Sequence, residues 1–170
     1  FAGAISVEQM GLLKKLHHTN IPFVIDTSGP ALNEIKKLKN VWLVKPNVDE
    51  LRQMIGKKIK DDSVSIKKHC IGLLDNIENI LVSRSGEGAI LISRLGCWKA
   101  KLAESKYKLV GTVGCGDYLL AGFLAGFKKT NSYRQALEYA VIAGSARAFG
   151  IDEKSFISTK RNLKIIVEEI

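Results

Sequence analysis

Short apolar runs alternate along the chain with longer amphipathic segments, a pattern typical of strands that alternate with helices. Four runs bounded by turn residues predict buried strands at Phe23–Ile25, Val41–Val44, Ile80–Val82 and Gly88–Ile92. The last run continues into Cys97–Lys99, which we expect to be its antiparallel neighbour. Strands that are apolar throughout indicate a sheet covered on both faces, so the pattern predicts an α/β fold.

Between these strands, apolar residues recur at helical spacing. The predicted helices are the segment before Thr19, Ala31–Leu38, the segment from Asn47 to Gly56, and Ser65–Leu74. Asn47 is a suitable N-cap because its side chain can accept a hydrogen bond from a first-turn amide. The acidic residues that follow it favour the positive end of the helix dipole.

The last third of the sequence predicts two consecutive helices. After Gly116, a stripe at i, i+3, i+4 and i+7 runs from Leu120 to Phe127, and a second stripe runs from Tyr133 to Gly144. Two glycines inside the first helix each cost about 1 kcal/mol relative to alanine, so we expect them to allow close packing on the sheet. Neither a repeat nor a linker interrupts the pattern, which predicts one compact unit.

Composition narrows the classes of function. The 170 residues carry a net charge of +9, with 13 basic and 9 acidic side chains in residues 1–85 and 13 against 8 afterwards. This even spread predicts anionic small-molecule ligands and no nucleic-acid partner.

No apolar run approaches the roughly 20 residues of a membrane span, so we expect no membrane contact. Three cysteines without CxxC spacing indicate neither a disulfide framework nor a zinc site, and with no secretory signal we expect a cytoplasmic protein.

The most informative segment is Val110–Asp117, directly before the strongest amphipathic helix. Gly114 and Gly116 flank Cys115, so the backbone can turn with its amides converging beside the positive end of a helix dipole, which is an anion site. A carboxylate at Asp117 is poorly suited to binding phosphate and well placed to take a proton from an attacking hydroxyl. The alternative is that Asp117 only caps the helix and the glycines only form a tight turn.

Two common nucleotide motifs are absent. The sequence contains no GxxxxGK[ST], and its two candidate GxGxxG stretches have Leu91 and Leu119 in place of the third glycine. A P-loop and a dinucleotide-binding fingerprint are therefore excluded.

Residues 112–117 resemble the T-x-G-A-G-D signature of the ribokinase/PfkB carbohydrate kinases, with Cys115 in place of the usual alanine. Three further stretches resemble elements of that family in the same order. They are 26–29 (D-x-S-G), 45–50 (K-P-N-x-x-E) and 82–89 (S-L-G-x-x-G-A). The resemblance covers nearly the whole chain.

The resemblance implies a three-layer α/β/α ribokinase-like fold with a mostly parallel sheet. It also implies that residues 1–170 are a single ATP-binding and catalytic portion, equivalent to the C-terminal half of such a kinase. The N-terminal half and its lid would then be absent, so we expect this portion alone to be inactive. The full-length enzyme would form a homodimer through that lid.

The same resemblance implies roles for individual residues. Asp117 would deprotonate the sugar hydroxyl, and the amides of Gly114, Cys115 and Gly116 would form an anion hole for the transferred phosphoryl group. Gly116 and Asp117 would also contact ATP. At a helix N-terminus the Cys115 thiol is either a reactive group of lowered pKa or an inert small side chain.

The resemblance also implies a nucleotide and metal site. Asn47 and Glu50 would organise Mg²⁺ and its waters, and Lys45 would contact the ATP phosphates. The nucleotide-binding loop would consist of Ser83, Arg84, Ser85, Gly86, Glu87 and Gly88. Within it, Arg84 is either a phosphate contact or a solvated charge. Ser85 stands where relatives have a glycine, which puts the shape of the loop in question.

The K-P-N and D-x-S-G forms are similar to those of the 1-phosphofructokinase and tagatose-6-phosphate kinase branch. This implies transfer of the ATP γ-phosphoryl group to a hydroxyl of a ketose phosphate, converting fructose 1-phosphate to fructose 1,6-bisphosphate. The alternatives within the family are a tagatose-6-phosphate kinase or another sugar or nucleoside kinase. The alternative from another class is a non-catalytic nucleotide-binding regulatory module.

Overall fold

The computed structural model describes residues 11, 15, 21–152, 155 and 162–170, which form two compact units. The first unit runs to Arg84 and includes 91–97, and the second combines 85–90 with the chain from Trp98 onward. The helix predicted before Thr19 lies outside the described residues, apart from Gly11 and Lys15. The prediction of a single portion over the whole chain stays a prediction.

Parallel strands form the centre of the first unit. β1 (Phe23–Ile25), β2 (Val41–Val44) and β3 (Ile77–Ser83) pair side by side in chain order, with Val41 opposite both Phe23 and Ile77. Most apolar side chains of these strands are buried, as the continuous apolar runs predict, and Val24 and Trp42 are half-buried. The three predicted strands are confirmed, and β3 begins three residues earlier than expected.

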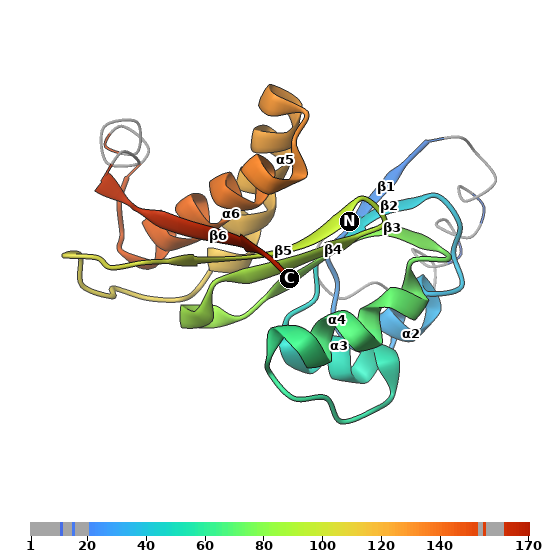
Figure 1. The fold of residues 1–170 in the computed structure, drawn as a ribbon. Coiled ribbons are helices and arrows are strands. Elements are labelled where there is room, and N and C mark those ends of the chain that lie inside the picture. The colour runs from blue at the N-terminus through green and yellow to red at the C-terminus, as the bar shows by residue number, and fades with distance from the viewer. Residues whose placement is uncertain (1–10, 12–14, 16–20, 153–154, 156–161) are drawn as a thin grey trace. The chain divides into compact units, whose positions relative to one another are not determined.

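Helices α2 (Ala31–Ile35), α3 (Val48–Ile55) and α4 (Ser63–Cys70) lie on one side of these strands (Figure 1), and a short 3₁₀ turn, η1 (Ile71–Leu73), follows α4. The N-cap of α3 is Asn47, as predicted, and Gly56 ends the helix in the left-handed region with φ 74°. Local sequence signals therefore set both ends of α3.

The second unit contains β6 and a helical pair, and β4 and β5 each have residues in both units. β4 (Ala89–Ser93) is followed after Arg94–Leu95 by β5 (Gly96–Leu102), a connection short enough only for a hairpin. β5 pairs antiparallel with β6 (Ile165–Glu169), a strand that the sequence did not predict. The helices are α5 (Cys115–Thr130) and α6 (Tyr133–Ala148), and a 3₁₀ turn, η2 (Ser85–Glu87), precedes β4.

The glycines inside α5 face α6. A Cβ at Gly122 would lie 2.6 Å from the Tyr139 carbonyl oxygen, and one at Gly126 would lie 2.7 Å from the Tyr139 Cβ. The expectation that these glycines pack on the sheet is therefore wrong. They allow two antiparallel helices to approach at backbone distance, which places the C-terminal end of α6 beside the N-terminal end of α5.

The prediction of an α/β fold is confirmed, and its sheet is mixed: parallel from β1 to β3 and antiparallel between β5 and β6. Within the described ranges, no helix has the length and apolar character that crossing a bilayer requires.

Candidate active site

The segment before α5 is fixed to the end of α6. The amides of Val110 and Gly111 both donate to the Ala148 carbonyl, at 2.8 and 3.2 Å. Gly114 then serves as the N-cap of α5 with φ 81°, a left-handed conformation that favours glycine. The glycine of the motif is thus needed for the turn that starts the helix.

The first-turn amides of α5 are those predicted to form an anion hole. The first intrahelical bond runs from the Tyr118 amide to the Gly114 carbonyl, at 3.0 Å. Helix geometry gives the amides of residues 114 to 117 no intrahelical acceptor. The Cys115 amide, however, donates to the Thr112 carbonyl at 3.2 Å, so the turn itself uses one of the three amides expected to bind an anion. The amides of Gly114 and Gly116 keep that predicted role.

Asp117 occupies the third position of α5, and its residue surface is exposed. The N-cap is Gly114, which has no side chain, and no side-chain hydrogen bond caps this helix. Asp117 therefore does not act as the N-cap, which excludes the capping role that the sequence left open for it. An exposed carboxylate in the first turn can accept a proton from a bound hydroxyl group.

The surroundings of Cys115 favour an inert thiol. Burial raises the pKa of the thiol above its ordinary value, and the nearby positive charge of Arg147 opposes that rise without cancelling it. The Sγ atom lies 3.7 Å from the Gly111 carbonyl oxygen, within reach of a weak hydrogen bond. The hypothesis of a thiol with a lowered pKa is therefore not supported.

Arg147 is a residue at this turn that sequence reasoning missed. It lies in the last turn of α6, and a Cβ at Gly114 would be 3.4 Å from its Nε. No motif marks this arginine, because it stands some 30 residues after the signature and reaches the turn only through the α5–α6 pairing.

In the first unit, Asn47 and Glu50 form a capping box at the start of α3. The Glu50 amide donates to Asn47 Oδ1 at 2.9 Å, and the Asn47 amide donates to Glu50 Oε2 at 2.8 Å. The box requires only one of the two carboxylate oxygens. A carboxylate and a carboxamide oxygen one helical turn apart fit Mg²⁺, which prefers oxygen ligands and retains several waters.

Ser83 lies next to this capping box. Asn47 and Ser83 form an isolated parallel bridge, and the Ser83 amide donates to the Pro46 carbonyl at 3.0 Å. The structure therefore brings together the end of β3 and the start of α3, two segments for which the family resemblance implies a nucleotide and metal site.

Lys45 is buried, and its Nζ lies 3.2 Å from Asp26 Oδ1. The two side chains are 7% and 14% exposed, so the lysine has a carboxylate partner in a largely dehydrated setting. Two of the sequence motifs, which contain Asp26 and Lys45, are thus joined directly by an ion pair.

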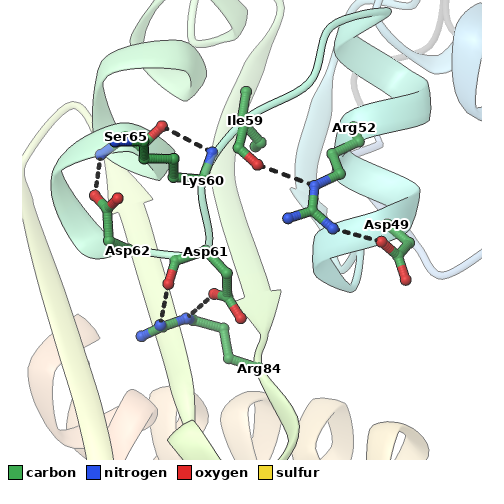
Figure 2. Close-up of polar contacts among 8 residues, drawn as sticks. All are labelled: Asp49, Arg52, Ile59, Lys60, Asp61, Asp62, Ser65 and Arg84. Atoms are coloured by element: carbon green, nitrogen blue, oxygen red, sulfur yellow. Dashed lines mark hydrogen bonds and ion pairs between the residues drawn. The ribbon is translucent and has the colours of Figure 1, made fainter.

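Arg84 binds the loop between α3 and α4. Its Nε donates to Asp61 Oδ1 at 2.6 Å, and its Nη2 donates to the Asp61 carbonyl oxygen at 2.8 Å (Figure 2). The arginine side chain is only 12% exposed, so it is not a freely solvated charge. Its direct partner is Asp61, and its predicted contact with ATP stays a prediction.

The rest of the predicted nucleotide loop lies in the second unit. Ser85 has φ 48°, so it adopts the left-handed conformation that favours glycine. Gly86 and Glu87 are exposed in η2. Gly88 has φ 78°, and a Cβ there would lie 2.0 Å from the Ala100 carbonyl oxygen, so only glycine fits. The loop shape is therefore compatible with Ser85 but depends on Gly88.

The predicted site residues thus fall into two sets. Those of the first unit are Lys45, Asn47, Glu50, Ser83 and Arg84, and those of the second are 85–88 and 114–117. Among the residues that the structure describes, no three His, Cys, Asp or Glu side chains form a metal-binding cluster.

Comparisons with known proteins agree on one family. The family model described as pfkB family carbohydrate kinase matches residues 4–150. A 1-phosphofructokinase from Bacillus subtilis is 37% identical over 132 residues, covering 76% of this chain and 42% of that protein. A tagatose-6-phosphate kinase from Staphylococcus epidermidis is 30% identical over 131 residues, covering 75% of this chain and 39% of that protein.

Solved structures share the fold. Phosphofructokinase-2 from Escherichia coli, in complex with substrates and products, has a TM-score of 0.81 at 22% identity, covering 95% of this chain and 55% of that one. Ribokinase from Arabidopsis thaliana, complexed with ribose and ATP, has a TM-score of 0.68 at 18% identity, covering 91% of this chain and 51% of that one. The chain spans less than half the length of the two curated relatives above.

Proposed function

The chain belongs to the pfkB family of carbohydrate kinases, and from that premise we propose that it provides the ATP-binding and catalytic portion of a sugar-phosphate kinase. The observation that carries the proposal is the start of α5. There Gly114 turns the chain so that first-turn amides converge, and the Asp117 carboxylate is exposed in the same turn.

In the proposed reaction, Asp117 accepts the proton of an acceptor hydroxyl as the hydroxyl oxygen attacks the γ-phosphorus of ATP. A new phosphorus–oxygen bond forms while the bond to the bridging oxygen breaks, and ADP leaves with that electron pair. The amides of Gly114 and Gly116 stabilise the negative charge on the transferred group. In water-poor surroundings such fixed donors are worth more than in bulk solvent.

We assign the metal and nucleotide roles to the other motifs. Bound Mg²⁺ would neutralise charge on the phosphates, and Asn47 and Glu50 would hold it together with its waters. Ser83 and the loop that follows it would contact the nucleotide. Lys45 would act on the phosphates from its ion pair with Asp26, which fixes the position of its ammonium group.

The proposed acceptor is a ketose phosphate, with fructose 1-phosphate converted to fructose 1,6-bisphosphate. This choice is supported by the 37% identity to a protein named 1-phosphofructokinase. A tagatose 6-phosphate acceptor is the second candidate, because a protein named tagatose-6-phosphate kinase is 30% identical. A nucleotide-binding module without catalysis is disfavoured, since such a module has no use for the exposed carboxylate of Asp117.

The experiment is a coupled ADP-release assay of the complete protein that contains this chain, with ATP and Mg²⁺. Fructose 1-phosphate, tagatose 6-phosphate, fructose 6-phosphate and plain fructose serve as acceptors. We expect kcat/KM to be highest for fructose 1-phosphate. A higher value for tagatose 6-phosphate would select the second candidate, and ATP binding without turnover of any acceptor would support the regulatory alternative.

A further inference from the structure

A positive side chain stands beside the first turn of α5, where the proposed function places a phosphoryl group. Arg147 extends from the last turn of α6, and a Cβ at Gly114 would lie 3.4 Å from its Nε. Its guanidinium carbon lies 5.9 Å from the centre of the Tyr118 ring. Arg147 therefore contacts α5 from the side of the Gly114 turn.

The electrostatics of this placement favour an anion. The N-terminal end of a helix carries about half a positive charge, so a guanidinium group beside it is a repulsive arrangement. The charge is felt at the neighbouring thiol, since Arg147 lowers the pKa of Cys115 against the effect of burial. The negative end of α6 and the carboxylate of Asp117 offset part of this repulsion. A bound phosphoryl group would be attracted by both the guanidinium group and the N-terminal end of α5.

The location of Arg147 is fixed by the fold. The amides of Val110 and Gly111 donate to the carbonyl of Ala148, the next residue of α6, so the signature loop and the end of α6 form one hydrogen-bonded corner. Gly122 and Gly126 let the two helices approach closely enough to make that corner. A bulky side chain at Gly114 would reach the guanidinium, so glycine also keeps the space beside Arg147 open.

We propose that Arg147 is a phosphate-binding residue of this site, whose guanidinium binds the phosphoryl group held at the N-terminus of α5. The inference rests on the proposed function for the identity of the phosphoryl donor. Guanidinium groups bind phosphate oxygens through paired, charge-assisted hydrogen bonds and do not lose their proton at neutral pH. Arg147 thus supplies fixed positive charge, while Asp117 alone receives the proton.

The test compares Arg147→Gln and Arg147→Lys with Arg134→Gln in the complete protein. Arg134 is a matched control because it also lies on α6 but donates to the Val167 carbonyl, at 3.2 Å. We expect Arg147→Gln to lower kcat/KM for ATP on the order of 10- to 100-fold, and Arg147→Lys to recover part of it. Arg134→Gln should change it less than about twofold, and thermal unfolding checks that each variant folds.

A second readout separates this inference from the proposed function. Calorimetric titration with inorganic pyrophosphate should show weaker binding for Arg147→Gln than for the wild type, whether or not any sugar is phosphorylated. Weaker pyrophosphate binding in a protein without kinase activity would uphold Arg147 and reject the proposed function. Unchanged kcat/KM and unchanged pyrophosphate binding in a folded Arg147→Gln variant would overturn the role of Arg147 and show that it only balances the end of α6.

Discussion

Two glycines of the predicted nucleotide loop differ sharply in their surroundings. A Cβ at Gly88 would lie 2.0 Å from the Ala100 carbonyl oxygen, and the residue has φ 78°. A Cβ at Gly86 would meet no atom within 4 Å. We therefore predict that Gly88→Ala lowers the free energy of unfolding by about 3 kcal/mol, through strain and overpacking, while Gly86→Ala changes it by less than about 0.5 kcal/mol.

Urea unfolding of both variants measures this difference. Equal stability of the two variants would mean that β4 and β5 can separate locally to admit a side chain at Gly88. Loss of stability in the Gly86 variant would contradict the open surroundings found for that residue.

Cys115 provides a pH-dependent test of the charge distribution at the Gly114 turn. Burial raises the pKa of its thiol and Arg147 opposes the rise, so the thiolate should form at a higher pH than in a free cysteine. We predict that alkylation by iodoacetamide accelerates only above the range of free cysteine. Removing the opposing charge in Arg147→Gln should shift the pH midpoint of alkylation further upward.

The measurement is the alkylation rate as a function of pH, followed by mass spectrometry of native protein. Cys70 and Cys97 are buried, and burial together with the proximity of Cys97 raises the pKa of Cys70 to about 12, so Cys115 should react first. A midpoint for Cys115 below that of free cysteine would refute this account of its surroundings.

At the level of secondary-structure elements, we expect two ion pairs of equal length to contribute unequally to the free energy of unfolding. The Arg84–Asp61 and Arg52–Asp49 pairs (Figure 2) both have an N–O distance of 2.6 Å. The Arg84 side chain is only 12% exposed, whereas the Asp49 side chain is 87% exposed. We predict that Asp61→Asn costs about 1–3 kcal/mol, because it leaves a poorly solvated guanidinium group without its charged partner. Asp49→Asn should cost about 0.5 kcal/mol or less.

Chemical denaturation of the two variants provides the comparison. In the complete protein, Asp61→Asn should also raise KM for ATP, since Arg84 stands at the start of the predicted nucleotide loop. Equal stabilities for the two variants would show that the contact between Arg84 and the α3–α4 loop contributes no more than a surface pair.

The elements that could be predicted are those whose signals are local. The N-cap at Asn47, the stop at Gly56 and the apolar runs of β1 and β2 act within a few residues, and the structure confirms them. β6 was missed because Ile165–Glu169 contains two charged residues in five, and its pairing with β5 is a long-range choice.

The site residues also divide into those marked by local sequence signals and those placed by long-range contacts. The turn at Gly114 and the exposed carboxylate at Asp117 follow from the spacing of one motif. The partner of Arg84 is 23 residues away, and the approach of Arg147 to Gly114 depends on the packing of α5 against α6. A glycine within a helix predicts close packing but does not say against which element, which is why Gly122 was assigned to the sheet instead of α6.

At the scale of the whole molecule, the net charge of +9 is spread over both halves of the sequence. Part of the positive charge is compensated by ion pairs, such as those of Lys45 with Asp26 and of Arg84 with Asp61. The rest provides a general attraction for anionic ligands, which under the proposed function are ATP and sugar phosphates, and this attraction raises encounter rates at low ionic strength. Under the proposed function, specific recognition of these ligands is the role of the Gly114 turn and the other motif residues.

The most direct test of the central claim is the effect of Asp117→Asn on the complete protein that contains this chain. The account predicts a loss in kcat of about 100- to 10,000-fold in ADP release with the preferred acceptor, and little change in ATP affinity, because the amide keeps the shape but cannot accept the proton. Glu104→Gln, at another exposed acidic residue of the second unit, should leave kcat unchanged. A folded Asp117→Asn variant with kcat within about threefold of the wild type would contradict the assignment of Asp117 as the base.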